Sequence, residues 1–472
     1  MHAVILGNGI IGASIAFRLT QRLAAGDRIT LVGKKARPGS ATLAAAAMLN
    51  SFAEIEKGSL DSEIDRYRFK LSQAAARMWP AFEKELVDAG AAMAAGAGLE
   101  LGTYVVNNTA ADDLDDENFD AIEAALRDHR EPYELVAPRE IPNYLPQQRH
   151  RATRALYIPS EGWMNPRLVM ERLDAILSRH PQVTLVDDDA ASLVKQGGKI
   201  SGIKTESGNT IGGDNFVLAT GATASDVLRA SNLGIGMQRV FYGVGVSVEL
   251  RSPDYPHRKC IRTPNRGLAC GIYSVPYYTG ADAPNDHILV GATNFISPTP
   301  YPYGRLTSVE GLMRGAMEQI NANFYRADLV RINVGWRPTS LDTYPLLGKS
   351  SIGNLVVATG TKRDGFHLAP LISEKLVAML FGEPADKDFA RFAPERAPLR
   401  TLSRAQAIDK AVRHIISGAY QHGFTPSKDR MPDQLAKMHR EELERLHDKV
   451  GAHDWGIPPE MIDMYRYGHA AA

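Results

Sequence analysis

Three glycines close to the N-terminus have the spacing of a phosphate-binding turn. The sequence GNGIIG places Gly7, Gly9 and Gly12 after an apolar run at residues 2–6 and before apolar residues at helical spacing. The first glycine permits a tight turn, the second lets a pyrophosphate approach the backbone, and the third lets the helix pack closely on the strand. The helix N-terminus adds unpaired N–H groups and a positive dipole. The pattern indicates a dinucleotide site, and a glycine-rich turn without a ligand is the alternative.

The next strand ends without the acidic residue that such sites commonly use to bind an adenosine ribose. Residues 29–32 form a buried-strand pattern, and Gly33, Lys34 and Lys35 follow it. We expect Gly33 to offer its backbone there and one of the two lysines to reach a phosphate or a 2′-substituent. Binding would then be weaker than with an acid at this position.

A second glycine-containing turn lies near residue 360. In VATGTKRDGFHLAP, the strand-like run 355–359 is followed by Gly360, Gly365 and the start of a helix. Such a turn exposes backbone N–H groups to an anion or to a carbonyl oxygen. Two of these turns, separated by a β-rich region, are unlike a nicotinamide dehydrogenase. A long cofactor such as FAD requires both, one for its pyrophosphate and one for its isoalloxazine ring.

The elements that must position these turns alternate between strands and helices. Helical spacing of apolar residues occurs in 59–89, from Pro166 onward, in 306–320 and in 432–450, and strand patterns occur in 2–6, 29–32, 183–220, 287–293 and 355–359. The first two strands and the helix between them form a βαβ unit. Residues 90–151 are more polar and show no long period, which indicates part of a second domain.

Composition excludes several classes of function. The 472 residues carry no formal net charge, so no overall field attracts nucleic acid or an anionic membrane. Apolar runs fall short of the ~20 residues that a membrane helix needs. Cys260 and Cys270 give neither a metal-ligand spacing nor a disulfide framework, and no metal is expected. The first strand begins almost at Met1 and leaves no room for a signal peptide, so we expect a cytoplasmic protein.

Several blocks, taken in order, resemble a known family. They read VILGNGIIGASIAFRL, GSATLAAAAML, EGWMNPRLV, NFVLATGATAS, HILVGAT, GWRPTSLDTYPLLG and LVVATGTKRDGFHLAPL. The chain from residue 1 to about 394 resembles the FAD-dependent glycine and D-amino-acid oxidase superfamily, in particular its glycine oxidase and sarcosine oxidase branch. The polar segment 90–151 and the C-terminal tail are not covered by this resemblance.

The resemblance implies an α/β fold with a doubly wound, Rossmann-like FAD-binding domain and a substrate domain with a mixed β-sheet. Residues 1–90, 151–228 and 333–395 would form the discontinuous FAD-binding domain, and 91–150 and 229–332 the substrate domain. Residues 396–472 would form a helical C-terminal extension. Packing on its own body is the expected role of this extension, and a dimer interface or a cap over the site are the alternatives.

The resemblance also implies which residues hold a non-covalent FAD. The expected cofactor-binding residues are Gly7, Gly9, Ile10, Ile11, Gly12, Gly33, Lys34, Thr42, Ala46, Ala47, Met48, Ala191, Gly360, Thr361, Asp364, Gly365, Phe366 and His367. Ala191 would meet the adenine through its backbone, and residues 361–367 would wrap the flavin. Departures from the family pattern are Gly33 for the usual Glu, Ala47 for a Gly, and the bulky Trp336.

Three residues are expected at the substrate by the same resemblance. Arg337 falls on the family's carboxylate-binding arginine, and a structural arginine paired with Asp342 is the alternative. Arg363 matches a family position near substrate and flavin, and an exposed turn residue without that role is the alternative. Tyr273 aligns with a tyrosine that touches substrate, although a strand tyrosine commonly belongs to the core. Lys362 could assist O₂ reduction, but a solvated turn lysine is the expectation.

The implied reaction is oxidation of the C–N bond of a small amine or amino acid. Hydride passes from Cα to flavin N5, and O₂ reoxidises the flavin to give H₂O₂. One alternative is an amino-acid dehydrogenase with a different electron acceptor. Another is a non-catalytic flavoprotein partner subunit. The expected partners are the substrate and O₂, and neither nucleic acid nor a membrane is expected. The chain could also form a homo-oligomer.

Overall fold

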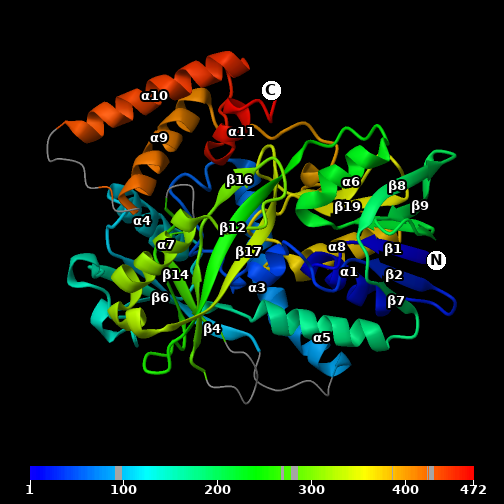
Figure 1. Cartoon of the computed structure of the whole chain (residues 1–472), viewed down its shortest axis with the longest axis horizontal. Coiled ribbons are helices and arrows are strands. Elements are labelled where there is room, and N and C mark those ends of the chain that lie inside the picture. The colour runs from blue at the N-terminus through cyan, green and yellow to red at the C-terminus, as the bar shows by residue number, and fades with distance from the viewer. Residues whose placement is uncertain are drawn as a thin grey trace.

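A six-stranded sheet occupies one half of the computed structural model, which describes residues 1–90, 98–266, 271–277, 285–384, 386–421, 424 and 430–471 (Figure 1). Its order is β18 (Leu346–Lys349), β19 (Leu355–Thr359), β11 (Asn215–Leu218), β1 (His2–Leu6), β2 (Arg28–Val32) and β7 (Val183–Val186). Neighbouring strands are parallel except for β18 and β19. Segments far apart in the sequence therefore meet in one sheet, as the resemblance implies.

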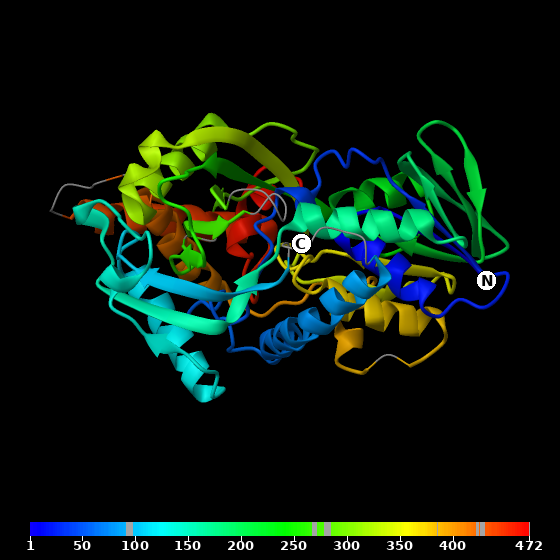
Figure 2. The same ribbon diagram turned by 90° about the horizontal axis from the view of Figure 1, so that it is seen from below.

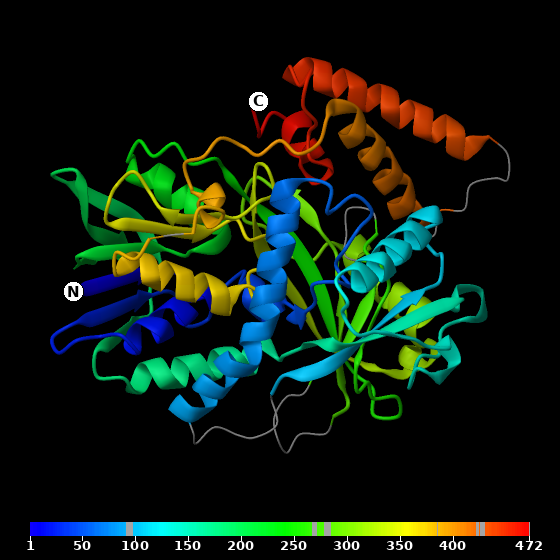
Figure 3. The ribbon, with the colours of Figure 1, turned by 180° about the vertical axis from the view of Figure 1, so that it is seen from behind.

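Both faces of this sheet are covered, so its strands carry apolar residues on both sides. Ala3 and Ile5 of β1 pack with helices α1 (Ile10–Thr20), α3 (Glu63–Ala89), α5 (Pro166–Arg179) and α8 (Ala369–Leu380). Val4 and Leu6 face β8 (Ala190–Gln196), β9 (Lys199–Thr205) and α6 (Ala224–Ser231) instead. Strand β10 (Thr210–Gly212) completes that small sheet. Figure 3 shows α3 and α8 toward the viewer. The predicted doubly wound arrangement is confirmed.

A ten-stranded mixed sheet forms the other half of the molecule (Figure 2). Its order is β16 (Phe295–Ser297), β12 (Val240–Arg251), β15 (His287–Gly291), β14 (Tyr273–Pro276), β13 (Cys260–Arg262), β4 (Glu100–Asn107), β6 (Arg154–Trp163) and β3 (Met48–Leu49); β17 (Asp328–Ser340) pairs with β12, and β5 (Glu134–Leu135) with β6. Helices α4 (Asp113–Asp128) and α7 (Leu306–Gly315) accompany this sheet.

Two strands of the ten-stranded sheet come from segments that the resemblance places in the FAD-binding domain. Strand β6 pairs with β4 across most of its length, so 154–163 lie in the ten-stranded sheet although 151–228 were assigned to the FAD-binding domain. Strand β17 likewise pairs with β12 up to Ser340, beyond the boundary at 333. A strand joins the sheet that offers it hydrogen-bond partners, and a local pattern does not name the partner. The division into FAD-binding and substrate domains stays a prediction.

The C-terminal extension packs on its own chain. Helices α9 (Arg404–Gln421), α10 (Met431–Val450) and α11 (Ile462–Arg466) lie beside the ten-stranded sheet (Figure 1). Their apolar side chains surround Phe241 of β12, which is fully buried among Ile408, Leu443, Trp455 and Ile462. Among the described residues, no helix is both long enough and apolar enough to span a membrane.

Candidate active site

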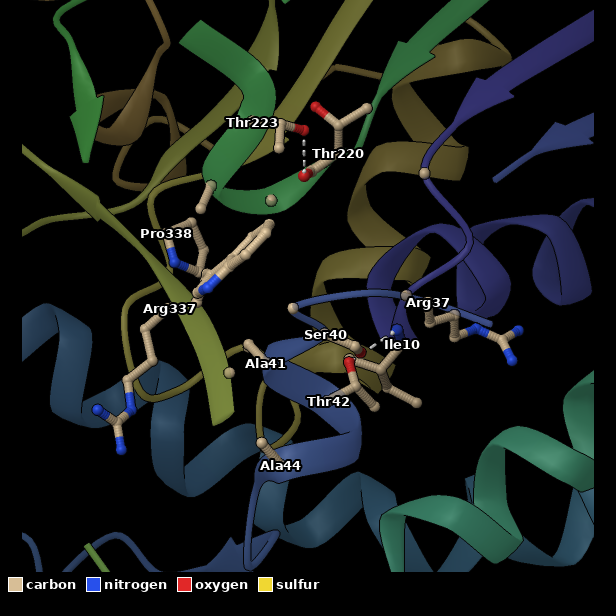
Figure 4. A pocket seen from close by; sticks show the side chains of 18 of the residues that line it. Ile10, Arg37, Ser40, Ala41, Thr42, Ala44, Thr220, Thr223, Arg337 and Pro338 are labelled. Carbon is tan, nitrogen blue, oxygen red and sulfur yellow. Dashed lines mark hydrogen bonds between the residues drawn. The ribbon is translucent and has the colours of Figure 1, made fainter. Parts of the chain in front are cut away.

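A cavity of about 640 Å³, here termed the large cavity, is lined by segments from both sheets. Most of its lining comes from residues 7–11, 37–48, 189–191, 219–223, 335–338 and 358–367. Figure 4 shows part of it, with Ile10 and Thr42 on one side and Arg337 on strand β17 on the other. The two glycine-containing turns recognised in the sequence thus open into the same space, although Gly7 and Gly360 are 353 positions apart in the chain.

The turn between β1 and α1 depends on its first and third glycines for packing. Gly7 has φ +102°, and a Cβ on it would lie 2.3 Å from the Ala219 carbonyl oxygen. A Cβ on Gly12 would lie 1.9 Å from the Gly7 carbonyl oxygen. Gly9 is different, because the nearest atom to an added Cβ is Thr42 Oγ1 at 3.6 Å. The space beside the Gly9 Cα therefore belongs to the cavity and is not filled by neighbouring protein atoms.

The N-terminus of α1 presents its backbone to this cavity. The Ile10 N–H donates to Thr42 Oγ1 at 3.2 Å, as the dashed line in Figure 4 marks. The first turn of the helix contains no acidic side chain that would occupy the site. Free N–H groups and the helix dipole at this end favour an anionic ligand.

Two buried polar atoms on the cavity wall lack a protein partner. Thr220 Oγ1 and His367 Nδ1 make no hydrogen bond within the described residues. Both residues line the large cavity, from the β11–α6 loop and from the turn before α8 respectively. Since buried polar groups in folded proteins are nearly always paired, these atoms indicate a bound polar ligand.

The turn before α8 is held rigidly. Gly360 has φ +71°, and Thr361, Gly365, Phe366 and His367 line the large cavity. Phe366 stacks on Trp79 with ring centroids 5.0 Å apart, and the Trp79 indole N–H donates to the His367 carbonyl oxygen at 2.8 Å. Burial lowers the pKa of His367, so its ring stays neutral and suits a binding role rather than proton transfer.

The environment of Lys362 differs from the expectation drawn from the sequence, because the side chain is buried and paired. Its side chain is only 10% exposed, and Nζ pairs with Glu460 Oε1 of the C-terminal extension at 2.6 Å. The local sequence favours a solvated turn lysine, because nothing in it shows that a residue 98 positions downstream folds over Lys362. Burial lowers the pKa of Lys362, while Glu460 opposes that shift.

Arg337 lies on β17 and lines the large cavity together with Tyr273 of β14. Its Nη1 donates to the Thr293 carbonyl oxygen at 2.9 Å and to Asn294 Oδ1 at 3.1 Å. The alternative pairing with Asp342 is wrong, because Asp342 is bound by Arg396. Within the described part of the chain, Arg337 has no carboxylate partner, so a cation faces the cavity with bonding capacity left for an anion.

Tyr273 and Arg363 also line the large cavity. The Tyr273 ring lies over Gly291, where an added Cβ would meet its hydroxyl group. Arg363 is 21% exposed by side chain and lies 3.5 Å from Glu54 Oε2 and 4.0 Å from Glu56 Oε1. Arg363 is therefore a half-buried, acid-paired residue and not an exposed turn arginine.

At the opposite end of the cavity, Asn8 fills the space beside Gly33. A Cβ on Gly33 would lie 2.4 Å from Asn8 Cγ, and the Asn8 amide donates to the Gly33 and Lys34 carbonyl oxygens. Lys34 Nζ pairs with Glu206 at 2.6 Å and with Asp189 at 3.1 Å. Two carboxylates from the β8–β10 sheet thus reach the end of the cavity where the strand itself supplies none.

Most of the predicted site residues line the large cavity. These are Gly7, Gly9, Ile10, Ile11, Lys34, Thr42, Ala46, Ala47, Met48, Ala191, Tyr273, Arg337, Thr361, Arg363, Gly365, Phe366 and His367. Gly12, Gly33 and Gly360 shape the turns behind the lining. Asp364 faces a second cavity and pairs with Arg68 at 2.6 Å. Cys260 is buried outside the large cavity, and Cys270 lies outside the described residues.

Comparison with known families decides which cofactor belongs here. Residues 2–379 match the model of the FAD dependent oxidoreductase (DAO) family. The chain belongs to this family. The resemblance seen in the sequence is confirmed, and this oxidoreductase is FAD-dependent like its family.

Several named proteins align with most of this chain. It is 24% identical over 405 residues to the glycine oxidase of Geobacillus kaustophilus (83% of this chain, 96% of the relative) and 24% identical over 432 residues to the hydrogen cyanide synthase subunit HcnC of Pseudomonas aeruginosa (84% and 97%). It is 25% identical over 398 residues to the bifunctional protein ThiO/ThiG of Nostoc sp. (84% of this chain), and it spans only 55% of that protein's length.

Solved structures share the fold. The glycine oxidase from Geobacillus kaustophilus superposes with a TM-score of 0.69 at 23% identity and covers 84% of this chain and 98% of its own. The iminodiacetate oxidase IdaA from Chelativorans sp. gives a TM-score of 0.68 at 22% identity, with 84% and 100% covered. These likenesses confirm the α/β architecture with its mixed second sheet.

The large cavity fits FAD by its own chemistry. The N-terminus of α1 suits a pyrophosphate, and Thr220 Oγ1 offers an unused hydroxyl group on the facing wall. Asp189 and Glu206 could accept hydrogen bonds from ribose hydroxyl groups near Ala191. At the other end, His367 Nδ1 and the exposed backbone of the turn before α8 could meet polar edges of the flavin.

Sequence reasoning missed several residues of this site. Glu54 lines the large cavity and bridges Arg363 to the fully buried Arg262. The available signal for Glu54 was its position shortly after Met48, just beyond the alanine-rich block 39–49. Asn8 lies inside the GNGIIG motif, but at a position that the motif leaves open, and Asp189 and Glu206 belong to no motif. Their meeting depends on how separate strands are placed.

Proposed function

We propose that this protein is an oxidase of a small amine or amino acid. The substrate would bind in the large cavity between Arg337 and Tyr273, with its amine-bearing carbon toward the flavin. The turn between β1 and α1 and the turn before α8 would hold FAD, which would supply a hydride acceptor for that carbon. Water would hydrolyse the imine product, and O₂ would take up the two electrons and leave as H₂O₂.

The observation that carries the proposal is the guanidinium of Arg337. It lines the cavity, and its Nη1 is fixed by one backbone oxygen and one side-chain oxygen. No carboxylate within the described residues neutralises it. A fixed guanidinium binds a carboxylate in a bidentate manner, which would orient an amino acid. Named relatives such as the glycine oxidase of Geobacillus kaustophilus support the same class of substrate.

The remaining residues would position the reactants and exclude water. Tyr273 is 5% exposed and could donate its hydroxyl group to the substrate carboxylate beside Arg337. Ala46, Ala47 and Met48 leave a smooth apolar wall on which the ring could lie. The neutral His367 and the stacked Phe366 and Trp79 would hold the turn at the ring edge without taking part in proton transfer. Catalysis would rest on orientation and electrostatics.

The test uses purified FAD-loaded protein mixed anaerobically with a panel of amino acids and N-methyl amines. Bleaching of the flavin absorbance by an amino acid, followed by return of the yellow colour and formation of H₂O₂ on admission of air, is the expected result. Bleaching without reoxidation by air would favour a dehydrogenase. Protein that binds FAD but is bleached by no amine would favour a partner subunit and overturn the proposal.

The variant Arg337→Ala isolates the proposed carboxylate site. We expect it to keep the FAD absorbance and to lose about 100-fold in kcat/KM, the equivalent of ~3 kcal/mol. Arg314→Ala is the control, because that arginine is on α7 and makes an i,i+4 pair with Glu310 away from the cavity. Equal activity of the two variants would contradict the role given to Arg337.

A further inference from the structure

A second cavity of about 240 Å³, here termed the extension cavity, adjoins the large cavity. Glu54, Lys362 and Arg363 line both cavities, so these three side chains form the boundary between them. The other walls are residues 50–72, the 341–344 turn and the C-terminal extension between 398 and 465. The family model ends at residue 379, so the wall made by the extension lies outside the part of the chain that this model matches.

The charged side chains around the boundary pair with one another. Lys362 pairs with Glu460 at 2.6 Å and Lys410 with Glu56 at 3.1 Å. Arg363 lies within 3.5 Å of Glu54. Burial opposes the ionisation of Glu460, but the nearby charges of Lys362 and Arg363 outweigh it and lower its pKa, so the carboxylate is ionised. Because carboxylates already neutralise these lysine and arginine side chains, the boundary has little free positive charge to attract an anionic ligand.

Two residues of the extension that line this cavity nevertheless have a buried polar atom without a partner among the described residues. Glu460 Oε2 and His414 Nδ1 have no hydrogen-bond partner within the described residues, and both residues line the extension cavity. His414 is 7% exposed, and burial lowers its pKa to about 4, so its ring is neutral. An ionised carboxylate oxygen can only accept, whereas a neutral imidazole nitrogen can accept or donate. The cavity is therefore suited to a group that donates hydrogen bonds.

We propose that the extension cavity binds the far end of the substrate and selects for a hydrogen-bond donor there. This inference rests on the proposed function. The reacting amino-acid group would lie between Arg337 and Tyr273, and the chain would pass the boundary at Glu54 and Arg363. Its terminal hydroxyl, amide or ammonium group would donate to Glu460 Oε2 and contact His414. Glu460 and His414 are then specificity-determining residues supplied by the extension.

The test compares amino acids that differ only at the far end. Lysine, norleucine and 2-aminoadipate share a six-carbon chain that ends in an ammonium donor, a methyl group and an acceptor-only carboxylate. Each is supplied as both enantiomers, and kcat/KM is taken from anaerobic flavin bleaching. We expect lysine to exceed norleucine by about 10-fold, as one additional buried hydrogen bond to a charged group predicts, and 2-aminoadipate to be the poorest.

The variant Glu460→Gln reverses the chemistry of the site, because an amide can present N–H where the carboxylate presented a lone pair. We expect the lysine-to-norleucine ratio to fall to about 1 and 2-aminoadipate to improve. A ratio of rate constants cancels any general effect on Lys362 or on the flavin. His414→Phe, which keeps the volume and removes the ring nitrogens, provides a second reading if the first variant is unstable. Glu441→Gln on the exposed face of α10 is the control.

The outcomes separate the two proposals. Bleaching by glycine, alanine or sarcosine, together with equal kcat/KM for lysine and norleucine, would overturn this inference and leave the proposed function intact. A preference for lysine that Glu460→Gln does not alter would also overturn it. If no amine bleaches the flavin, the proposed function itself fails. A donor preference that both extension variants abolish, and that Glu441→Gln retains, supports the inference.

Discussion

The large cavity and the extension cavity are neighbours built by different means. Alanine and glycine are the most frequent residue types in the lining of the large cavity. The extension cavity is walled by long charged side chains from segments as distant as residues 54 and 460. One therefore depends on close backbone approach, and the other on ion pairs that form only when the tail folds over the body.

This difference separates general function from selectivity. A site built from backbone and small residues suits a cofactor whose shape does not change. A site made from paired charges can be altered by single substitutions without disturbing the sheets. We infer that the family's chemistry belongs to the large cavity and the choice of substrate to the extension cavity.

The largest expected effect is in the turn between β1 and α1. Gly12→Ala places a Cβ 1.9 Å from the Gly7 carbonyl oxygen. The helix is packed against the strand and cannot move away to relieve this clash. We expect a loss of more than about 3 kcal/mol in the free energy of unfolding, visible as a large drop in Tm. Gly9→Ala is the matched variant: its Cβ has room, so the apoprotein should unfold like wild type while FAD binds at least about tenfold more weakly. Equal behaviour of both would contradict the distinction between packing and ligand space.

The next effect concerns the anchor of the extension. Asp342 is 3% exposed and accepts hydrogen bonds from the Leu399 and Tyr344 N–H groups and an ion pair from Arg396. Asp342→Asn leaves Arg396 without its counter-charge, so we expect a loss of about 3 kcal/mol in chemical unfolding. The control Asp448→Asn removes an exposed pair with Arg404 and should cost less than about 1 kcal/mol. Similar losses would show that the extension is held elsewhere.

Acid should loosen the wall of the extension cavity. Burial lowers the pKa of His414 to about 4, below the ordinary 6.5 that it regains on unfolding. Protonation therefore favours the unfolded state: the stability is intact above pH 6.5 and falls as the pH drops toward 4, by up to about 3 kcal/mol. Unfolding measured between pH 4 and 7 should decline less steeply for His414→Gln. Parallel pH profiles of the two proteins would refute this assignment.

The smallest expected effect is at the ribose end of the large cavity. Gly33→Glu alone should not tighten FAD binding, because its Cβ collides with the Asn8 side chain. The double variant Asn8→Gly, Gly33→Glu removes the obstacle, and we expect it to lower the Kd of FAD by about tenfold. Fluorescence titration of the apoprotein measures both. Tighter binding by the single variant would mean that Asn8 does not define this end of the cavity.

Local patterns in the sequence predicted many of the elements. The helix expected over 432–450 is α10, Met431–Val450, with Pro432 in its first turn and Gly451 in the left-handed conformation at its end. The helix expected over 59–89 is α3, Glu63–Ala89, which begins four residues later than expected, behind the capping side chain of Ser62. Proline and glycine act on their own backbone, so their effects are visible without knowledge of the fold. These predictions are confirmed.

The polar segment shows where local patterns fail. Residues 90–151 gave no clear period, yet they contain β4 and the 16-residue helix α4. Phe119, Ile122 and Leu126 of α4 do have helical spacing and are fully buried, but acidic residues between them obscure the stripe. Tertiary burial of one narrow face stabilised a helix that composition alone did not reveal.

The sequence by itself determined that two glycine-containing turns, an alanine-rich segment and Arg337 belong to an FAD-dependent oxidoreductase, because glycine geometry and ordered blocks are local properties. Only the tertiary structure decided that Lys362 is buried against Glu460, that Asp342 binds Arg396 and not Arg337, and that Asn8 fills the space beside Gly33. Each of these depends on side chains brought together by sheet order and helix packing, and ion pairs and steric contacts across such separations leave no spacing in the chain that could be read.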